Sequence, residues 1–528
     1  MRFATWFVSA AALGACTPQA AAPVQAPPTE QAAPASNWKQ VEPAKQKQSL
    51  VPEPAGVPAA DASCQQFTEP SSASCSKSGS DLDTLAQALN TNEPRERDAR
   101  LSCLESSSAF APGLVRALRA EFLAECADVI ALPLLEPRRA DLSRSVEDTL
   151  IALAAGGRLR RLVQKAPELS PPFDRARFMD FFQSTLKPWI VTQAAAIHDL
   201  AAVGPRLTPY AKGVVAIEAG LADMRFVSVV RQVPLPKEMS DDAEVRDAYY
   251  AALDEALEPR KARGRDAALV GLRELANEGV VFDARVDRAR ALLSEVYSGR
   301  RIDALDKLLL PEREPAASDT SERQLAARLP SFYSGMLLEG ATLDAPLLRA
   351  LMERGLPKVF AARLAPDKLD EPSKAWLAIA LFDRARVYFR AQDFASSAAL
   401  SATVKPSPNQ ALYHALADSL QNGPRDGSDL LLRGPQLPSG TARIKELDEL
   451  AAQKSPVAPL AAFDAAYLLG LVPPPNDPKF WDALGQRFEA ASRRLGDPAQ
   501  KKNAHEASVA AKDTAKALRT SPPAHTAP

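Results

Sequence analysis

The chain has 528 residues, with 64 Lys and Arg against 65 Asp and Glu, and a formal net charge of −1. This balance excludes a nucleic-acid-binding protein that depends on a bulk basic surplus, and four His with five Cys leave little material for a metal site. Hydrophobic residues make up 46% of the chain, so the composition predicts a soluble, helix-rich scaffold with a sizeable core.

The first residues, MRFATWFVSAAALGAC, have the pattern of an export signal. Arg2 precedes an apolar run over residues 3–15, which is too short to cross a hydrocarbon core of ~30 Å but fits a signal-peptide h-region. The sequence LGAC at 13–16 resembles the lipobox of bacterial lipoproteins. The resemblance implies a signal peptide at 1–15 and lipidation of Cys16. An ordinary secretory signal with an incidental cysteine is the alternative.

The segment that follows is expected to be a tether. Several acyl chains on Cys16 would anchor it durably, and Thr17 stands where an Asp in lipoproteins suggests inner-membrane retention. The resemblance therefore implies the outer membrane, facing the periplasm, with surface exposure as a further possibility. Residues 16–60 are rich in Pro and Ala, which predicts a disordered linker of polyproline character.

The remaining cysteines agree with export, because an even number in a secreted chain permits two disulfides. They are Cys64, Cys75, Cys103 and Cys126. The last two lie in consecutive expected helical stretches, at 95–105 and 113–130, which a short loop could bring together. Among the three possible connectivities we therefore favour Cys103–Cys126 and, by default, Cys64–Cys75.

From about residue 81 onward, apolar residues recur at helical spacing. Leu142, Val146, Leu150 and Leu153 share one helix face. Two consecutive helices are expected at 266–278, ending before Gly279, and at 283–297, with Asp283 as N-cap. Breaks are expected at 156–157, 171–172, 204–205 and 234–236. Since no series of period-2 runs occurs, the predicted fold class is all-α.

The best candidate boundary inside the helical body is the polar, aperiodic segment 311–322, PEREPAASDTSE. It would link an irregular α-helical domain at 61–310 to a second helical domain at 323–518, which is followed by a disordered tail at 519–528. The alternative is a long surface loop within one continuous superhelix.

The second half contains a repeat-like pattern. Leu381, Ala385, Tyr388 and Phe394 have the spacing of tetratricopeptide positions 4, 8, 11 and 17, and Trp481, Leu484, Gly485 and Phe488 match W-x₂-L-G-x₂-Y with Phe for Tyr. The segment thus resembles tetratricopeptide repeats, which implies a helical-repeat superhelix over about 380–518, where a small residue lets the neighbouring helix approach. The second-helix motif is missing, and an Ala- and Lys-rich helix at 499–518 would cap the array. An unrelated α-bundle is the alternative.

Motifs for catalysis or cofactor binding are missing from the sequence. G-x-S-x-G, G-x-x-x-x-G-K-[ST] and G-x-G-x-x-G do not occur, and the HE pair at 505–506 begins a zinc-protease motif that Val509 breaks. His198 is expected to be partly buried and hydrogen-bonded, whereas His414 and His525 have no visible partner. We therefore expect no enzyme activity, no metal site and no small-molecule cofactor.

Two basic clusters remain. They consist of Arg158, Arg160 and Arg161, and of Arg260, Lys261, Arg263 and Arg265. Either cluster could touch lipid A, anionic phospholipid or an acidic partner, but solvated helix ends and loops are the favoured interpretation.

Together these features predict an outer-membrane-anchored periplasmic lipoprotein that acts as a non-catalytic protein–protein interaction scaffold of an envelope assembly. Its partners would be envelope proteins and, through Cys16, the membrane, but not nucleic acid. One alternative is a peptidoglycan-binding or cell-wall-modifying enzyme, or a synthase regulator. Another is a structural spacer between membrane and wall.

Overall fold

The computed structural model describes residues 50–53, 57–60, 62–67, 79–296, 305–388, 390–421, 444–471 and 476–520. These residues confirm the expected all-α class: within them no strand forms, and two isolated β-bridges are the only β pairing. The expected signal peptide, Cys16, most of the tether and residues 521–528 lie outside the described part of the chain.

The helices fall into an N-terminal and a C-terminal half. Those of the first half are α2 (Ala62–Gln65), α3 (Asp81–Asn90), α4 (Pro94–Ser102), α5 (Leu114–Leu123), α6 (Ala127–Leu135), α7 (Arg144–Gln164), α8 (Arg175–Phe181), α9 (Lys187–Val203), α10 (Pro209–Arg231), α11 (Lys237–Ser240), α12 (Ala243–Asn277) and α13 (Ala284–Val296). Those of the second half are α14 (Ser321–Arg328), α15 (Ser331–Leu337), α16 (Ala345–Arg354), α17 (Glu371–Tyr388), α18 (Ala391–Ser401), α19 (Pro408–Leu420), α20 (Lys445–Ala451), α21 (Ala458–Gly470), α22 (Pro478–Arg494) and α23 (Pro498–Thr520). Short 3₁₀ or π turns are η2 (Ala124–Cys126), η3 (Phe182–Leu186), η4 (Gly204–Arg206), η5 (Lys358–Phe360) and η6 (Pro366–Lys368).

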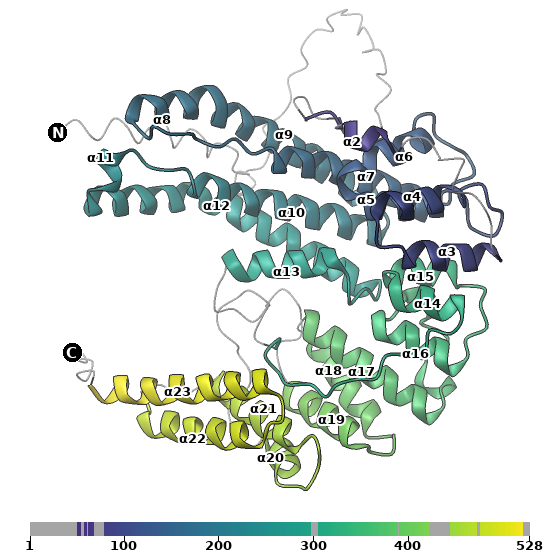
Figure 1. Cartoon of the computed structure of the whole chain (residues 1–528), viewed down its shortest axis with the longest axis vertical. Helices are drawn as coiled ribbons and strands as arrows, with labels where there is room; N and C mark the ends of the chain where they lie inside the picture. The colour runs from purple at the N-terminus through teal and green to yellow at the C-terminus, as the bar shows by residue number, and fades with distance from the viewer. Residues whose placement is uncertain are drawn as a thin grey trace, which may run out of the picture.

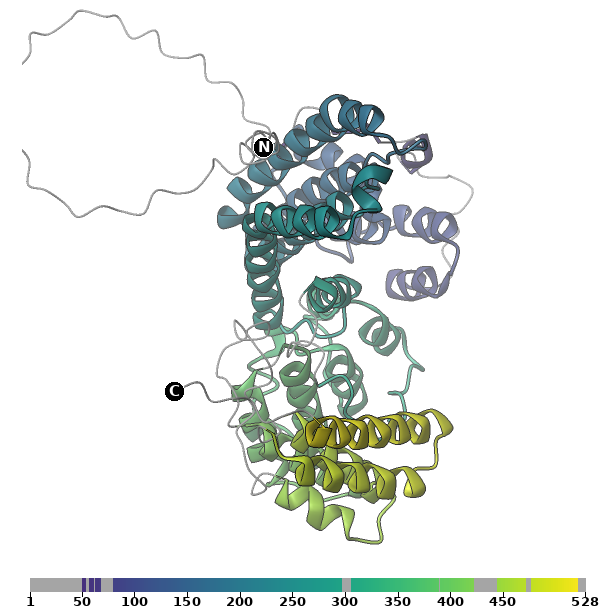
Figure 2. The ribbon, with the colours of Figure 1, turned by 90° about the vertical axis from the view of Figure 1, so that its left-hand side faces the viewer.

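The two halves follow each other along an elongated molecule (Figures 1 and 2). In the first half α10 is central, because it packs against α7, α9, α12 and α13. In the second half each helix from α16 to α23 packs on the next one in the chain. One continuous apolar core extends from Val51 to Leu468 and so passes through both halves. A second cluster, which includes Leu484 and Phe488, lies between α21, α22 and α23.

Helix starts follow from the local sequence. Ser80 and Asp83 form a capping box at α3, and the side chains of Ser143 and Asp344 accept backbone N–H bonds at the starts of α7 and α16. Proline stands in the first turn of α4, α10, α19 and α22, where its missing N–H has no helical partner to lose. The breaks expected at 171–172, 204–205 and 234–236 are confirmed.

The break expected at 156–157 is wrong, because both glycines lie inside α7. Their role is close packing. A Cβ on Gly157 would lie 2.7 Å from the Ala124 carbonyl oxygen, and a Cβ on Gly156 would lie 3.1 Å from Cγ of Glu218. The pair therefore allows α7 to approach its neighbours on two sides.

Glycines also allow α10 and α12 to approach closely. A Cβ on Gly220 would lie 2.7 Å from the Gly264 carbonyl oxygen, and a Cβ on Gly271 would lie 2.8 Å from the Gly213 carbonyl oxygen. The glycines recur at the same interval on both helices, so the main chains touch along a seam.

Helix α12 is longer than the sequence pattern predicts. The expected start at Asp266 is wrong, since α12 begins at Ala243, whereas its end before Gly279 is confirmed. The next helix is also confirmed: α13 starts directly after Asp283, whose Oδ1 accepts a hydrogen bond from the Arg285 backbone N–H at 2.8 Å.

The favoured disulfide pairing is wrong. Cys64 is bonded to Cys126, with a Cα–Cα distance of 5.2 Å, so neither Cys103–Cys126 nor Cys64–Cys75 forms. Cys103 is disulfide-bonded as well, and Cys75 lies outside the described residues.

The physical reason is a break in the helix expected at 113–130. Helix α5 ends at Leu123, Ala124 has a positive φ of 37°, and η2 turns the chain before α6 begins. This turn directs Cys126 toward the short helix α2. A continuous helix would have presented Cys126 in a different direction.

The two halves meet at a contact between main chains, here called the central joint (residues 278–282 and 354–358). The Leu356 N–H donates to the Gly279 carbonyl at 2.7 Å, and Val280 forms an isolated bridge with Gly355. From α17, the Tyr388 hydroxyl donates to the Val280 carbonyl at 2.6 Å. The turn between α12 and α13 is thereby fixed to the turn after α16.

Candidate functional site

The candidate site is formed by an irregular segment that crosses the helices of the second half. Residues 305–316, here called the strap, contain no helix beyond a turn at their start. Figure 1 shows this stretch crossing the lower half of the molecule toward α16. The helices α16 to α21, here called the array, supply the side chains that hold it.

The first contact lies at α21. The Leu309 backbone N–H donates to Oδ1 of Asp464 at 2.8 Å, and Asp464 is fully buried. Its second oxygen, Oδ2, has no hydrogen-bond partner among the described residues. A buried carboxyl group on an apolar helix thus recognises the main chain of the strap.

The second contact lies at α17 and α19. Arg313 donates two hydrogen bonds to Asp383, at 2.7 and 2.8 Å, and Asp383 is only 1% exposed. The Arg313 guanidinium also lies 5.4 Å from the ring centroid of Tyr413, within cation–π range. Such a bidentate pair fixes both the position and the orientation of the arginine.

The third contact lies at α16. The Ala316 backbone N–H donates to Oε2 of Glu353 at 2.9 Å, and Arg349 donates to the Glu314 carbonyl. Arg349 in turn pairs with Glu353 at 3.1 Å. This end of the strap is therefore held through its main chain on both sides of Pro315.

These contacts place one segment across several helices. From Leu309 to Ala316 an extended chain covers about 23 Å at ~3.3 Å per residue, which equals two to three interhelical distances of ~8–10 Å. Helices α16, α17, α19 and α21 each contribute a contact. The array thus holds the strap much as a groove holds an extended peptide.

Burial changes the acid–base behaviour of this site. Burial, with the Leu309 hydrogen bond acting against it, raises the pKa of Asp464 well above its ordinary value. Burial also raises the pKa of Tyr413 to about 12, although Arg313 opposes the shift. The direction of the Asp464 shift follows from burial of a carboxyl group whose only opposing contact is the Leu309 backbone N–H.

We expect Asp464→Asn to stabilise the protein increasingly as pH rises. The amide oxygen can still accept the Leu309 N–H, and it carries no charge to bury. Because the folded pKa is raised above the unfolded value of ~3.9, the wild type loses stability as pH rises from that value through the folded pKa. Melting temperatures measured from about pH 4.5 to about pH 8 should show a growing advantage for the variant.

The control for this prediction is Asp448→Asn on α20, whose side chain is 44% exposed and pairs with Arg487. Its effect should stay within about 1 kcal/mol at both ends of the pH range. An Asp464→Asn advantage that is constant with pH would show that Asp464 does not titrate with folding.

A second buried polar cluster joins the two halves. Arg285 on α13 pairs with Glu121 on α5 and lies 3.5 Å from Glu218 on α10. The hydroxyls of Tyr210 and Tyr333 donate to Glu121 at 3.3 and 3.2 Å. Because Glu121 and Glu218 both contact Arg285, and Tyr333 reaches Glu121 from α15, the cluster links helices of both halves.

The first basic cluster is neither a lipid-binding patch nor a solvated helix end, so both interpretations are wrong. Arg161 pairs with Asp128 at 2.6 Å, Arg160 pairs with Glu218, and Arg158 donates to the Pro52 carbonyl at 2.7 Å. These arginines lie in the C-terminal third of α7, where Arg158 and Arg161 fix the segment that precedes α2.

The second basic cluster lies on α12 and has partners on α10. Arg263 pairs with the buried Asp223 at 2.6 Å, and the Arg260 guanidinium lies 4.0 Å from the ring centroid of Phe226. Neither arginine is therefore a simple solvated charge.

The repeat-like residues lie on three helices. Leu381, Ala385 and Tyr388 are on α17 and Phe394 is on α18, whereas Trp481, Leu484, Gly485 and Phe488 are all on α22. All are buried except Leu381 and Trp481, which are partly exposed. At Gly485 a Cβ would lie 3.2 Å from the Ser508 carbonyl oxygen of α23, so the helices approach closely there.

The histidines differ from expectation. His198 is exposed on α9, so the expected partial burial is wrong. His414 does have partners, because its Nδ1 lies 3.1 Å from the Ala398 carbonyl oxygen and its Nε2 lies 3.7 Å from Glu446. His505 is exposed, and His525 lies outside the described residues.

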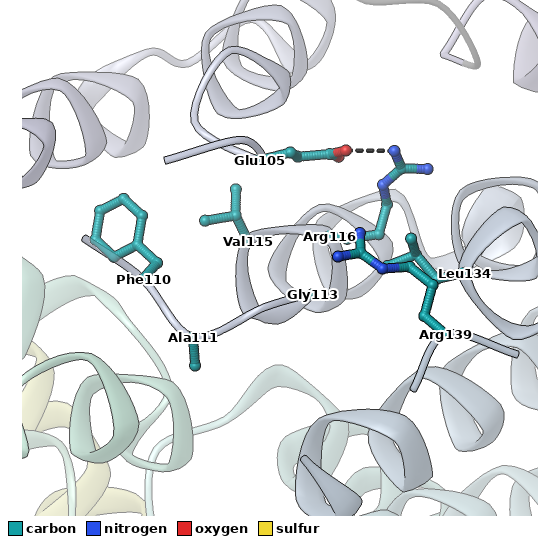
Figure 3. A pocket seen from close by; sticks show the side chains of 8 residues that line it. All are labelled: Glu105, Phe110, Ala111, Gly113, Val115, Arg116, Leu134 and Arg139. Atoms are coloured by element: carbon teal, nitrogen blue, oxygen red, sulfur yellow. Dashed lines mark hydrogen bonds and ion pairs between the residues drawn. The ribbon is translucent and has the colours of Figure 1, made fainter. Parts of the chain in front are cut away.

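A small hollow with about 320 Å³ of empty space, partly open to solvent, lies at the start of α5. Figure 3 shows Arg116 reaching Glu105 across it, with Arg139 beside Arg116. Since Arg139 pairs with Asp141, each arginine already has a carboxylate. The hollow therefore offers no surplus positive charge to an anion.

Within the described part of the chain, no group of three or more His, Cys, Asp or Glu side chains is placed to hold a metal ion. No described helix combines the length and apolar character needed to cross a membrane.

Sequence reasoning missed the residues that hold the strap. Asp464 stands alone in LAAFDAAYLLG, and Asp383 stands in an apolar stretch, AIALFDRARVYF. A single carboxylate within an apolar helix needs a buried donor, and this signal could have identified both. The partner Arg313 lies in the segment expected to be a linker or a surface loop, so the pairing itself was not visible.

The chain matches no known protein-family model, no curated protein and no solved structure. Its function therefore has to be inferred from the chemistry of its own residues.

Proposed function

We propose that this protein is an outer-membrane-anchored periplasmic lipoprotein whose helical array binds a segment of another envelope protein. The observation that carries the proposal is the strap, which the array holds through two main-chain N–H groups and one arginine. A surface that holds its own chain in this way has the chemistry to hold an extended peptide.

A tetratricopeptide-like superhelix is part of the proposal. The sequential packing of α16 to α23 supports it. Close packing within the helix pairs also supports it: the Ser397 hydroxyl on α18 donates to the Ala378 carbonyl on α17 at 2.7 Å. Stacked helix pairs of this kind create long binding surfaces without catalytic groups.

The lipoprotein part of the proposal rests on the LGAC sequence at 13–16 and the Pro-rich segment after it. The body supplies a firm attachment point for such a tether. Val51 is fully buried, Arg158 and Arg161 donate to the carbonyls of Pro52 and Pro58, and a disulfide at Cys64 follows. A disulfide is the bond expected in an oxidising compartment.

The test uses the full chain in intact bacterial cells, with its signal sequence. Metabolic labelling with palmitate should mark the wild type but not Cys16→Ala, and the label should sediment with outer membranes. After cross-linking in the cells, the wild type should retain a stoichiometric protein partner that the Asp383→Asn variant loses.

Three outcomes would contradict the proposal. The first is an unlabelled wild type. The second is equal capture by wild type and Asp383→Asn, which would mean that the array is not the binding surface. The third is release of muropeptides from purified sacculi, which would identify a cell-wall enzyme instead.

A further inference from the structure

We propose that the strap is an internal ligand, and that the partner segment is an extended, arginine-containing peptide that displaces it from the array. This inference rests on the proposed function, because it names the partner class and the regulation of the same site.

The strap has the contact pattern of a ligand. Leu308, Pro311 and Ala316 are buried, whereas Glu312 and Pro315 between them are exposed. Buried and exposed positions therefore interchange along one short segment, as they do when a peptide lies on a surface. A strand of a core would be covered on both sides.

The array meets the strap with three carboxyl groups and with Arg349, which donates to the Glu314 carbonyl. Three carboxyl groups meet the strap, from Asp464, Asp383 and Glu353, and each accepts from an N–H group of the strap. Two of these bonds are to the main chain, so they do not depend on the side chains of the ligand. Only the Asp383 contact selects a residue type, and its bidentate geometry selects arginine over lysine.

The site also retains an unused acceptor. Oδ2 of Asp464 is buried without a hydrogen-bond partner among the described residues. A ligand with one additional N–H donor near this oxygen would make a bond that the strap does not make. Such a ligand would make one contact with the array that the strap does not make.

Displacement follows from competition. The strap belongs to the same chain as the array, so its local concentration at the array is high. A peptide added in trans binds only the fraction of molecules whose strap is released, which weakens its apparent affinity by that fraction. Loosening the strap should therefore strengthen binding in trans, while damage to the array should abolish it.

The Arg313–Asp383 pair allows these two cases to be separated. Arg313→Ala removes the pair from the strap side and leaves the acceptor Asp383 available. Asp383→Asn removes the same pair from the array side. Both variants lose the same ion pair, so each is the matched control for the other.

The experiment titrates each full-length protein with a fluorescent peptide of sequence LDKLLLPEREPAAS, which corresponds to residues 305–318. Fluorescence anisotropy should show binding to Arg313→Ala at least about tenfold tighter than to the wild type. Asp383→Asn should bind at least about tenfold more weakly than Arg313→Ala. A peptide with Ala in place of its arginine should lose the difference between the two variants.

Two further variants keep the test decisive if either protein unfolds. Arg313→Lys keeps the charge but loses the bidentate geometry, so it should bind the peptide with an affinity between wild type and Arg313→Ala. Tyr413→Leu removes the ring beside the arginine and should weaken binding when combined with Arg313→Lys. Melting curves identify which proteins are folded.

Equal peptide binding by the Arg313 and Asp383 variants would overturn the inference, as would the absence of binding by a folded Arg313→Ala. The titration contains no envelope protein, so this failure would leave the scaffold proposal standing. Conversely, the protein could bind the peptide as expected and yet capture no Asp383-dependent partner in cells. That result would contradict the proposed function and leave the strap inference standing.

Discussion

Replacement of Gly279 by alanine should destabilise the protein more than any other single methyl group added to a glycine. Gly279 has a φ of +79°, and a Cβ there would lie 1.6 Å from the Leu356 carbonyl oxygen. Only a shift of one main chain away from the other can relieve this clash, and that shift breaks the Leu356–Gly279 hydrogen bond. We expect a loss of more than about 4 kcal/mol in the free energy of unfolding, or no soluble protein.

The matched control is Gly340→Ala. Gly340 is exposed, and nothing lies within 4 Å of the position that its Cβ would take. Its effect should stay within about 0.5 kcal/mol. Chemical denaturation of both variants measures the difference, and similar stability of the two would mean that the central joint does not hold the halves together.

Arg285→Met should have the second largest effect. Methionine has roughly the volume of the arginine side chain, but it leaves Glu121 and Glu218 buried without the cation that they share. Breaking a buried pair from one side costs about 3–5 kcal/mol. Arg288→Met is the control, because Arg288 is 47% exposed and lies 3.5 Å from Glu218; we expect it to cost no more than about 1 kcal/mol.

The stability lost in Arg285→Met should depend on pH in a defined direction. Burial raises the pKa of Glu218, but Arg160, Arg285 and Arg288 outweigh it and hold that pKa below its ordinary value. A lowered folded pKa contributes stability that is present above the unfolded value of ~4.3 and lost as pH falls. Removing Arg285 withdraws part of this contribution, so thermal melts should show a larger deficit near neutral pH than near pH 4. A stability deficit that grows as the pH falls would contradict the role of Arg285 in lowering the pKa of Glu218.

Periodicity predicted the helices well where a large apolar face is buried. The helix after Asp283 and the stop before Gly279 were visible, because a cap and a glycine flank regular apolar spacing. The start of α12 was not visible. In its first half, Ala243–Arg260, Leu257 is the only buried side chain, so no regular apolar spacing marks that part of the helix.

The connections were harder to predict than the helices. Nothing in the sequence near Ala124 indicates a positive φ, since alanine favours a continuing helix. That single turn decides the partner of Cys126. Tertiary contacts there, including the close approach of Gly157, override local propensity.

The candidate site could not be predicted either, because it also depends on contacts between distant parts of the chain. The segment 311–322 is polar and aperiodic, which is typical of a linker, yet Arg313 within it pairs with an aspartate that is seventy residues further along the chain. A contact over such a separation follows from how the helices stack. Composition alone predicts exposure for this segment, and only the packed array provides the buried acceptors.

The most direct test of the account is hydrogen exchange along the strap in the purified full-length chain. The Leu309 and Ala316 amides, which donate to Asp464 and Glu353, should be protected in the free protein. Saturation of the Arg313→Ala variant with the trans peptide should remove that protection while leaving the amides of α10 and α12 protected. Strap amides that stay equally protected with and without bound peptide would show that the strap is a permanent part of the core, and would contradict an array built to exchange one extended segment for another.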